Sequence, residues 1–147
     1  MADEFVKNKN IFIAALDHYY DNGFTYVEAG DGDELWEHKH YKHIIKANGS
    51  VWQRVKVERN YVKWIELNQM ALICGHTHRE KFPKANELPY FNSGCCIFPS
   101  YITGLEIADD TITLAGWRIE ADEKRYLHIV RRVLAGPEPV STYHLKK

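Results

Sequence analysis

Two histidines separated by one residue, His76 and His78, directly follow a short apolar run that ends at Gly75. The run, residues 70–74, is typical of a buried strand, and open α/β sheets usually carry their chemistry at the carboxyl ends of strands. Gly75 allows a sharp backbone turn, and the His-x-His spacing can direct two imidazoles to adjacent points. Because neutral imidazole is the commonest protein ligand for borderline divalent metals, this stretch predicts a metal site.

A carboxylate, Asp31, follows a second strand-like run at residues 24–29. A carboxylate oxygen can bind a divalent metal, so Asp31 is a candidate ligand. The stretch around it, Gly-Asp-Gly-Asp-Glu, also suits a turn and a helix start, in which Asp31 would only cap the helix. Asp33 and Glu34 are better explained as helix-capping groups, or as groups that contact the metal ligands without binding the metal.

Three stretches, in this order, resemble blocks of the calcineurin-like metallophosphoesterases. Residues 30–34 are similar to the family's Gly-Asp block, residues 75–78 to its Gly-His-x-His block, and residues 90–95 to the small-residue turn that follows. The family's N-terminal Asp-x-His block has no counterpart before Gly30, and its central Gly-Asn-His block has none between Asp31 and His76. The chain therefore resembles such a domain with two of its blocks removed.

The resemblance implies hydrolysis of a phosphate ester by attack of a metal-activated hydroxide on phosphorus. His76 would serve one ion and His78 the other, with Asp31 between them, and the two divalent ions would be manganese, iron, zinc or nickel. Asn92 and Ser93 could position a substrate oxygen, although a polar turn explains them equally well. No catalytic acid is assigned, because the block that supplies it is missing. The alternatives are an inactive remnant that binds a metal or a protein, and a site completed by another subunit.

A competing metal site involves three histidines in the interval between the family-like blocks. His40 and His43 would share one face of a helix, and with His38 and Glu37 they could bind zinc or nickel. The same residues also suit a solvated helix face. A solvated helix face is likewise the interpretation for Asp17 and His18.

The elements that must position these groups follow from apolar spacing and turn residues. Helices are predicted at residues 8–22, 34–47 and 50–67, and strands at residues 24–29, 70–74, 102–107, 111–117 and 125–133. Asn-Gly ends the first helix, a turn is expected at residues 108–110, an exposed loop at residues 79–89, and a fraying tail beyond residue 137. The predicted class is α/β, with helices and strands alternating before antiparallel strands. The resemblance implies one domain over residues 1–147, a partial β-sandwich flanked by helices.

Composition narrows the setting and the partners of the chain. A formal net charge of −1 over 147 residues makes nucleic-acid binding by bulk charge unlikely. Neither an apolar run of the roughly 20 residues that span a bilayer nor a signal peptide is recognised, so a cytoplasmic location away from membranes is expected. The three cysteines should then be reduced thiols. Beyond a phosphate-ester substrate, exposed strand edges make a homo-oligomer a further expectation.

Overall fold

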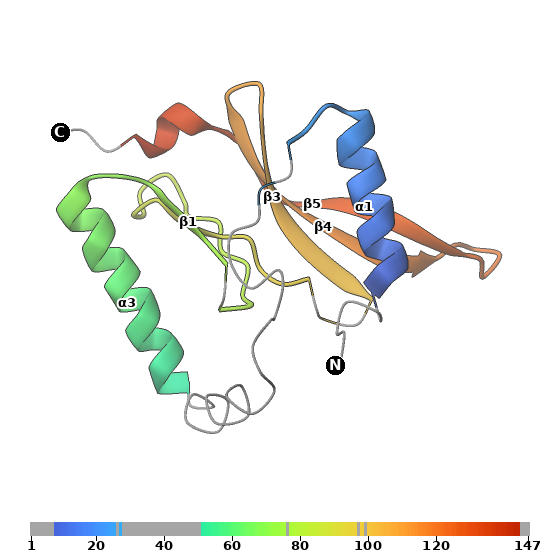
Figure 1. Ribbon diagram of the computed structural model, residues 1–147, viewed down its shortest axis with the longest axis horizontal. Helices are drawn as coiled ribbons and strands as arrows, with labels where there is room; N and C mark the ends of the chain where they lie inside the picture. Colours follow the sequence, from blue (N-terminus) through green and yellow to red (C-terminus); the bar gives the residue numbers. More distant parts are fainter. Residues whose placement is uncertain are drawn as a thin grey trace.

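The computed structural model describes residues 8–25, 27, 51–75, 77–96, 98 and 100–144, with the backbone alone described for residues 51–57. This part of the chain is a mixed α/β structure with a parallel pair of strands and an antiparallel sheet of three strands (Figure 1). The α/β class is confirmed at this level, and the helix predicted at residues 34–47 lies outside the described residues. In chain order the elements are α1 (Lys9–Asp21), α3 (Val51–Asn68), β1 (Leu72–Cys74), β2 (Tyr90–Asn92), β3 (Tyr101–Ala108), β4 (Thr111–Ala121), β5 (Leu127–Pro139) and the 3-10 helix η2 (Val140–Tyr143).

Helix α1 ends where the sequence predicts, because the chain turns at Asn22 and Gly23. Gly23 has a φ of +73°, in the left-handed region that is common just after a helix. The backbone N–H groups of both residues donate to carbonyl oxygens of the last turn, at 3.2 and 3.0 Å. Ile11 and Ala15, four residues apart, are both buried, so α1 presents one apolar face to the rest of the molecule.

The strand predicted at residues 24–29 is wrong for the residues that are described. Phe24, Thr25 and Val27 belong to no strand, and residues 26, 28 and 29 lie outside the described part. The Phe24 N–H donates to the Tyr19 carbonyl oxygen at 2.9 Å, and the two aromatic rings pack edge to face with centroids 5.5 Å apart. The chain therefore folds back onto the end of α1 instead of extending.

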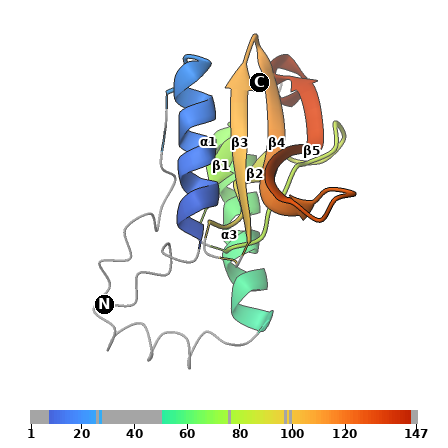
Figure 2. The ribbon, with the colours of Figure 1, turned by 90° about the vertical axis from the view of Figure 1, so that its right-hand side faces the viewer.

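Strand β4 is the centre of the three-stranded sheet and pairs antiparallel with β3 and β5 (Figure 2). At the β3–β4 turn Asp109 and Asp110 both have positive φ, +48° and +57°, as a two-residue turn of type I′ requires. The predicted hairpin and the predicted third strand are thus confirmed. Strand β5 runs on to Pro139, beyond its predicted end at residue 133.

One face of this sheet packs against α1. Ile11 and Ala15 of the helix form an apolar cluster with Ile102 of β3 and Trp117 of β4. The His18 ring lies edge-on to Trp117, with centroids 5.1 Å apart. His18 is therefore half-buried against the sheet, and the prediction that it lies on a solvated helix face is wrong, because the helix turns this side toward Trp117.

A polar network ties α1 to all three strands of the sheet. The Tyr19 hydroxyl accepts a hydrogen bond from Trp117 Nε1 at 3.0 Å and donates one to Glu106 Oε1 at 2.8 Å. Arg131 pairs with the same carboxylate through two nitrogens. Burial alone would raise the pKa of Glu106, but the hydrogen bonds from Arg131 and Tyr19 outweigh it and hold that pKa below its ordinary value. Burial raises the pKa of Tyr19 to about 12, so its hydroxyl stays neutral.

The opposite face of the sheet packs against β2 and the C-terminal segment. Ile112 lies an odd number of positions from Trp117 on β4 and so faces away from α1, where it clusters with Phe91 and Tyr143. The Tyr143 ring lies 4.8 Å from that of Phe91, and its hydroxyl donates to the Pro83 carbonyl oxygen at 3.0 Å. The expected fraying of the tail is wrong as far as Tyr143, because this ring fills the second core.

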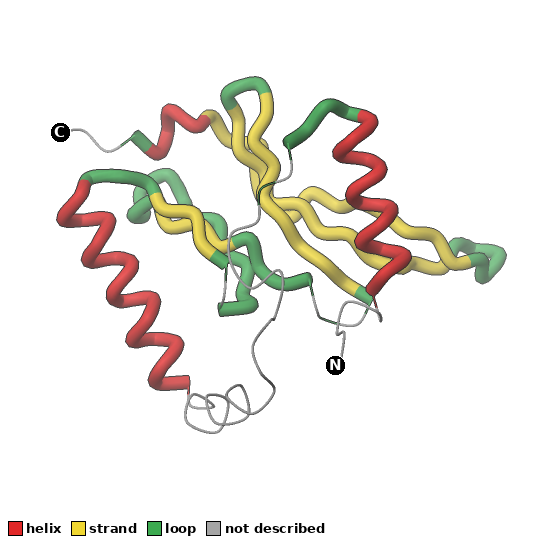
Figure 3. Tube along the Cα trace, viewed as in Figure 1, coloured by secondary structure: helices red, strands yellow, loops and turns green. Residues whose placement is uncertain are grey.

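Strands β1 and β2 form the parallel pair, and α3 packs beside it (Figure 3). Tyr61 of α3 lies against Tyr90 of β2 with ring centroids 5.5 Å apart, and Ile65 of α3 is fully buried. The helix predicted at residues 50–67 and the strand predicted at residues 70–74 are confirmed as α3 and β1. No helix in the described part of the chain is long and apolar enough to cross a membrane.

The loop at residues 79–89 is mostly exposed, as predicted, but it doubles back along β2 and buries its two prolines there. Lys81 and Asn92 exchange two backbone hydrogen bonds of 3.0 Å each, which form an isolated antiparallel bridge. Pro83 and Pro89 are fully buried. The loop therefore lines the edge of β2 that β1 leaves open.

Candidate functional site

The parallel pairing of β1 and β2 brings two of the family-like stretches to one edge. Leu72 lies opposite Tyr90 and Cys74 opposite Asn92, so both strands end at the same level. Gly75, Thr77 and His78 follow β1 at this carboxyl edge, and residues 93–96 follow β2 beside them. The Ser93 N–H donates to the Cys74 carbonyl oxygen at 3.0 Å, which extends the pairing one step past the strands. Such an edge is where open α/β sheets place ligands.

Asn92 fastens these two stretches to each other. Its side chain is fully buried, and its Nδ2 lies within hydrogen-bond distance of the Gly75 carbonyl oxygen (3.0 Å), Thr77 Oγ1 (2.9 Å) and the Tyr90 hydroxyl (3.1 Å). Its Oδ1 accepts a hydrogen bond from the Gly94 N–H at 2.9 Å. Both polar atoms are thus engaged within the protein. Asn92 holds the loop, as the polar-turn alternative would have it, and a substrate contact by Asn92 stays a prediction.

Gly94 and Thr103 anchor the second stretch onto β3. Gly94 has a φ of +88°, and a Cβ on it would lie 2.0 Å from Thr103 Oγ1, so only glycine fits here. The Cys95 N–H donates to Thr103 Oγ1 at 2.9 Å, and the Thr103 N–H donates to the Cys95 carbonyl oxygen at 3.0 Å. The stretch after β2 is therefore fixed both to the loop after β1 and to the larger sheet.

His78 is half-buried at this edge, and its ring is held by a cysteine. Its backbone has a φ of +53°, in the left-handed region that few non-glycine residues adopt. Its Nδ1 lies 3.1 Å from Cys95 Sγ. A ring nitrogen engaged in this way leaves Nε2 as the atom that can serve a metal. No feature of the sequence signals this contact, because the two residues are not close along the chain.

The three thiols of the chain, Cys74, Cys95 and Cys96, all lie in or next to these stretches and form no disulfide, as predicted. Burial raises the pKa of Cys74 above its ordinary value, so this thiol is protonated at neutral pH. Cys96 Sγ lies 3.9 Å from the Thr103 carbonyl oxygen. A reduced set of thiols therefore surrounds the end of β2.

Two of the three predicted metal ligands, Asp31 and His76, lie outside the described residues. Within the described residues, no group of three or more His, Cys, Asp and Glu side chains is placed to hold a metal ion. The convergence of Asp31 with the two histidines stays a prediction, as does a substrate contact by Ser93. The competing histidine cluster, Glu37, His38, His40 and His43, also lies outside the described part.

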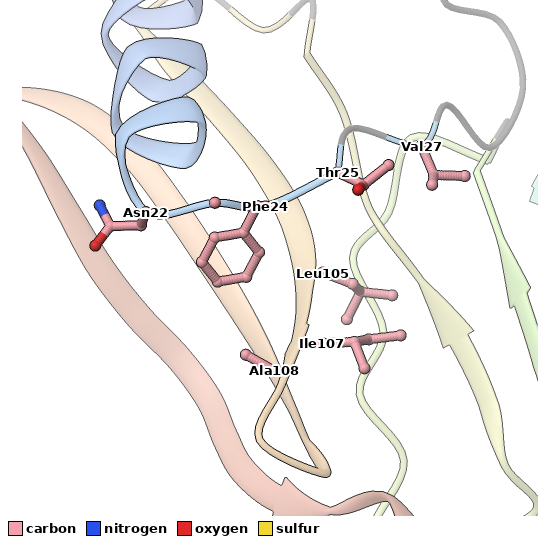
Figure 4. A pocket seen from close by; sticks show the side chains of 8 residues that line it. Asn22, Phe24, Thr25, Val27, Leu105, Ile107 and Ala108 are labelled. Carbon is pink, nitrogen blue, oxygen red and sulfur yellow. The ribbon is translucent and has the colours of Figure 1, made fainter.

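A separate depression lies at the end of α1, and its described lining includes none of the residues of this edge (Figure 4). Its described lining is apolar or uncharged, and it consists of Asn22, Gly23, Phe24, Thr25, Val27, Leu105, Ile107 and Ala108. The described residues of this lining include no acid, base or thiol.

Comparison of the chain with known protein families, with curated proteins and with solved structures finds no match. Family membership and activity are therefore proposals. They rest on the three sequence stretches and on the geometry of residues 74–95.

Proposed function

We propose that this chain carries a metallophosphoesterase site of the calcineurin-like type, with Asp31, His76 and His78 as the metal ligands. The observation that supports it is the junction at the carboxyl edge of β1 and β2. There Asn92 joins the loop with the histidines to the Asn-Ser-Gly turn through hydrogen bonds of 2.9 to 3.0 Å. Two of the three family-like stretches thus form one rigid unit, although residues 79–89 separate them in the chain.

The one described ligand, His78, fits a metal site. A half-buried imidazole with Nδ1 held by Cys95 Sγ at 3.1 Å has its ring orientation set and leaves Nε2 available. Divalent ions at such a site would lower the pKa of water and stabilise charge on a phosphoryl oxygen. The protein's part in the reaction is to hold the ligands in place, and the Asn92 hydrogen bonds to Gly75 and Thr77 do this for the loop that carries His78.

The arrangement of the sheets also supports the proposal. Two sheets meet through the cluster of Phe91, Ile112 and Tyr143, with α1 and α3 on outer sides of the assembly (Figure 1). The family resemblance implies one half of a sandwich flanked by helices, and such a half would have this arrangement. We therefore infer a single domain that retains part of that fold.

The test is hydrolysis of an aryl phosphate monoester and an aryl phosphate diester with added manganese. Because an ion contributes several kcal/mol to such a reaction, we expect turnover to fall about 100-fold in Asp31→Asn and in His78→Ala. His128→Ala is the matched control, since His128 pairs with Asp122 at 3.1 Å on the exposed β4–β5 turn and should not matter. Equal rates in all four proteins would contradict the proposal.

A second candidate function is that of an inactive remnant that binds metal or protein. It is favoured by the absence of the Asp-x-His and Gly-Asn-His blocks from the sequence. It is also favoured by the outer edge of β1, which pairs with no other strand in the described part of the chain. Manganese bound at a stoichiometry of one or more without any turnover would favour this alternative.

A further inference from the structure

We propose that Cys95 is the positioning residue for His78: its sulfur accepts a hydrogen bond from Nδ1–H and so fixes Nε2 as the nitrogen presented to a cation. The contact that carries this inference is the 3.1 Å separation between Nδ1 and Cys95 Sγ. The inference deepens the proposed function and rests on it for its metal-binding part. The contact between His78 and Cys95 stands by itself, whereas the position of the histidine proton is argued from the nitrogen that a cation would need.

The sulfur is held in place before any ligand binds. Cys95 is 4% exposed, and its backbone is fixed on both sides by Thr103, through hydrogen bonds of 2.9 and 3.0 Å. The preceding Gly94 N–H is bound to Asn92 Oδ1. Since a Cβ at Gly94 would strike Thr103, this backbone cannot shift easily. Cys95 Sγ is therefore a rigid partner rather than a mobile surface thiol.

The tautomer follows from the chemistry of imidazole. A neutral ring carries one N–H and one free lone pair, and the nitrogen that binds a metal must be the one with the lone pair. For His78 to offer Nε2, the proton must therefore lie on Nδ1, and Cys95 Sγ is the atom placed to accept its hydrogen bond. In metal sites such partners raise ligand affinity, and their loss typically weakens binding by about 10–100-fold.

The first experiment measures the tautomer of His78 in the metal-free, full-length protein by long-range ¹H–¹⁵N NMR. We expect the Nδ1–H form in the wild type, a shift toward the Nε2–H form in Cys95→Ala, and recovery in Cys95→Ser, whose oxygen is also an acceptor. Cys96→Ala is the matched control, because it removes the neighbouring thiol. An Nε2–H form in the wild type, or no change in Cys95→Ala, would overturn the proposal. If Cys95→Ala fails to fold, the wild-type and Cys95→Ser spectra still decide.

The second experiment titrates manganese into the same four proteins and follows binding by calorimetry. We expect affinity to fall about 10–100-fold in Cys95→Ala, with Cys96→Ala unchanged and Cys95→Ser close to the wild type. Tight binding that is unaffected by Cys95→Ala would overturn the positioning role while leaving the phosphoesterase proposal intact. An Nδ1–H tautomer in a protein that binds no manganese would support the Cys95–His78 pairing and remove the phosphoesterase proposal.

Discussion

Replacing Asn92 by alanine removes the side chain that joins the loop after β1 to the turn after β2. The Gly94 N–H loses its acceptor, and the Gly75 carbonyl oxygen and the hydroxyls of Thr77 and Tyr90 lose the amide nitrogen whose two N–H groups they share. All four belong to residues that are buried, so water does not readily replace the amide. The variant therefore tests whether this edge is rigid because of one side chain.

The expected loss in the free energy of unfolding comes from two backbone groups, the Gly75 carbonyl and the Gly94 N–H. A buried donor or acceptor left without a partner costs about 1–3 kcal/mol. The hydroxyls of Thr77 and Tyr90 can rotate toward each other, so they add little, whereas the Gly75 carbonyl and the Gly94 N–H cannot. We therefore expect Asn92→Ala to lower the free energy of unfolding by about 4 kcal/mol, twice the middle of that range.

Urea denaturation followed by far-UV circular dichroism measures this change. Ser93→Ala, at the adjacent half-buried position, is the control and should cost less than about 1 kcal/mol. Asn92→Asp should cost at least as much as the alanine variant, because a buried carboxylate would face the Gly75 carbonyl oxygen. A loss below about 1 kcal/mol in Asn92→Ala would refute the assigned role.

Three further changes test other parts of the structure. Gly94→Ala should lower the free energy of unfolding by about 2–5 kcal/mol in urea denaturation, because its Cβ overlaps Thr103 Oγ1 and its φ is positive. Because the pKa of Glu106 is lowered in the folded state, its carboxylate stabilises the fold fully above pH 4.5, its ordinary pKa, and this contribution is lost as the pH falls through the lowered pKa. The free energy of unfolding, measured by denaturation across pH 2 to 6, should therefore depend less on pH in Glu106→Gln. Tyr143→Ala should lower the melting temperature measurably, at a cost of about 3–5 kcal/mol, whereas His144→Ala should not; equal melting temperatures would show that the tail does not pack as described.

The sequence predicted those parts of the fold that depend on neighbouring residues, such as helix ends and hairpin turns. The Asn-Gly pair ends α1. The turn at residues 108–110 joins β3 and β4, which are consecutive in the chain and pair with each other. The strand predicted at residues 24–29 failed at its start because a local contact at the helix end outweighed its β-forming composition. The Phe24 N–H donates to the Tyr19 carbonyl oxygen five residues earlier, and the two rings pack together.

The sequence predicted which residue types form the candidate site, but it did not predict how these residues contact one another. Its position after β1 follows from an apolar run, but β2 has only three residues, too few to show periodicity. The contacts that shape the edge, Asn92 with Thr77 and His78 with Cys95, join residues on different segments. Tyr143 was missed similarly, since a lone aromatic residue in a polar tail gives no sign of the pocket that receives it.

The most direct test of the metal site is paramagnetic broadening by manganese in ¹H–¹⁵N spectra of the assigned protein. If Asp31 and the two histidines share a cation, substoichiometric Mn²⁺ should selectively broaden the amide signals of residues 30–32, 75–78 and 93–95, because all lie close to one ion. Broadening confined to residues 37–43 would identify the competing histidine cluster instead. Either that result, or uniform spectra with no selective broadening, would contradict a phosphoesterase centre at the carboxyl edge of β1 and β2.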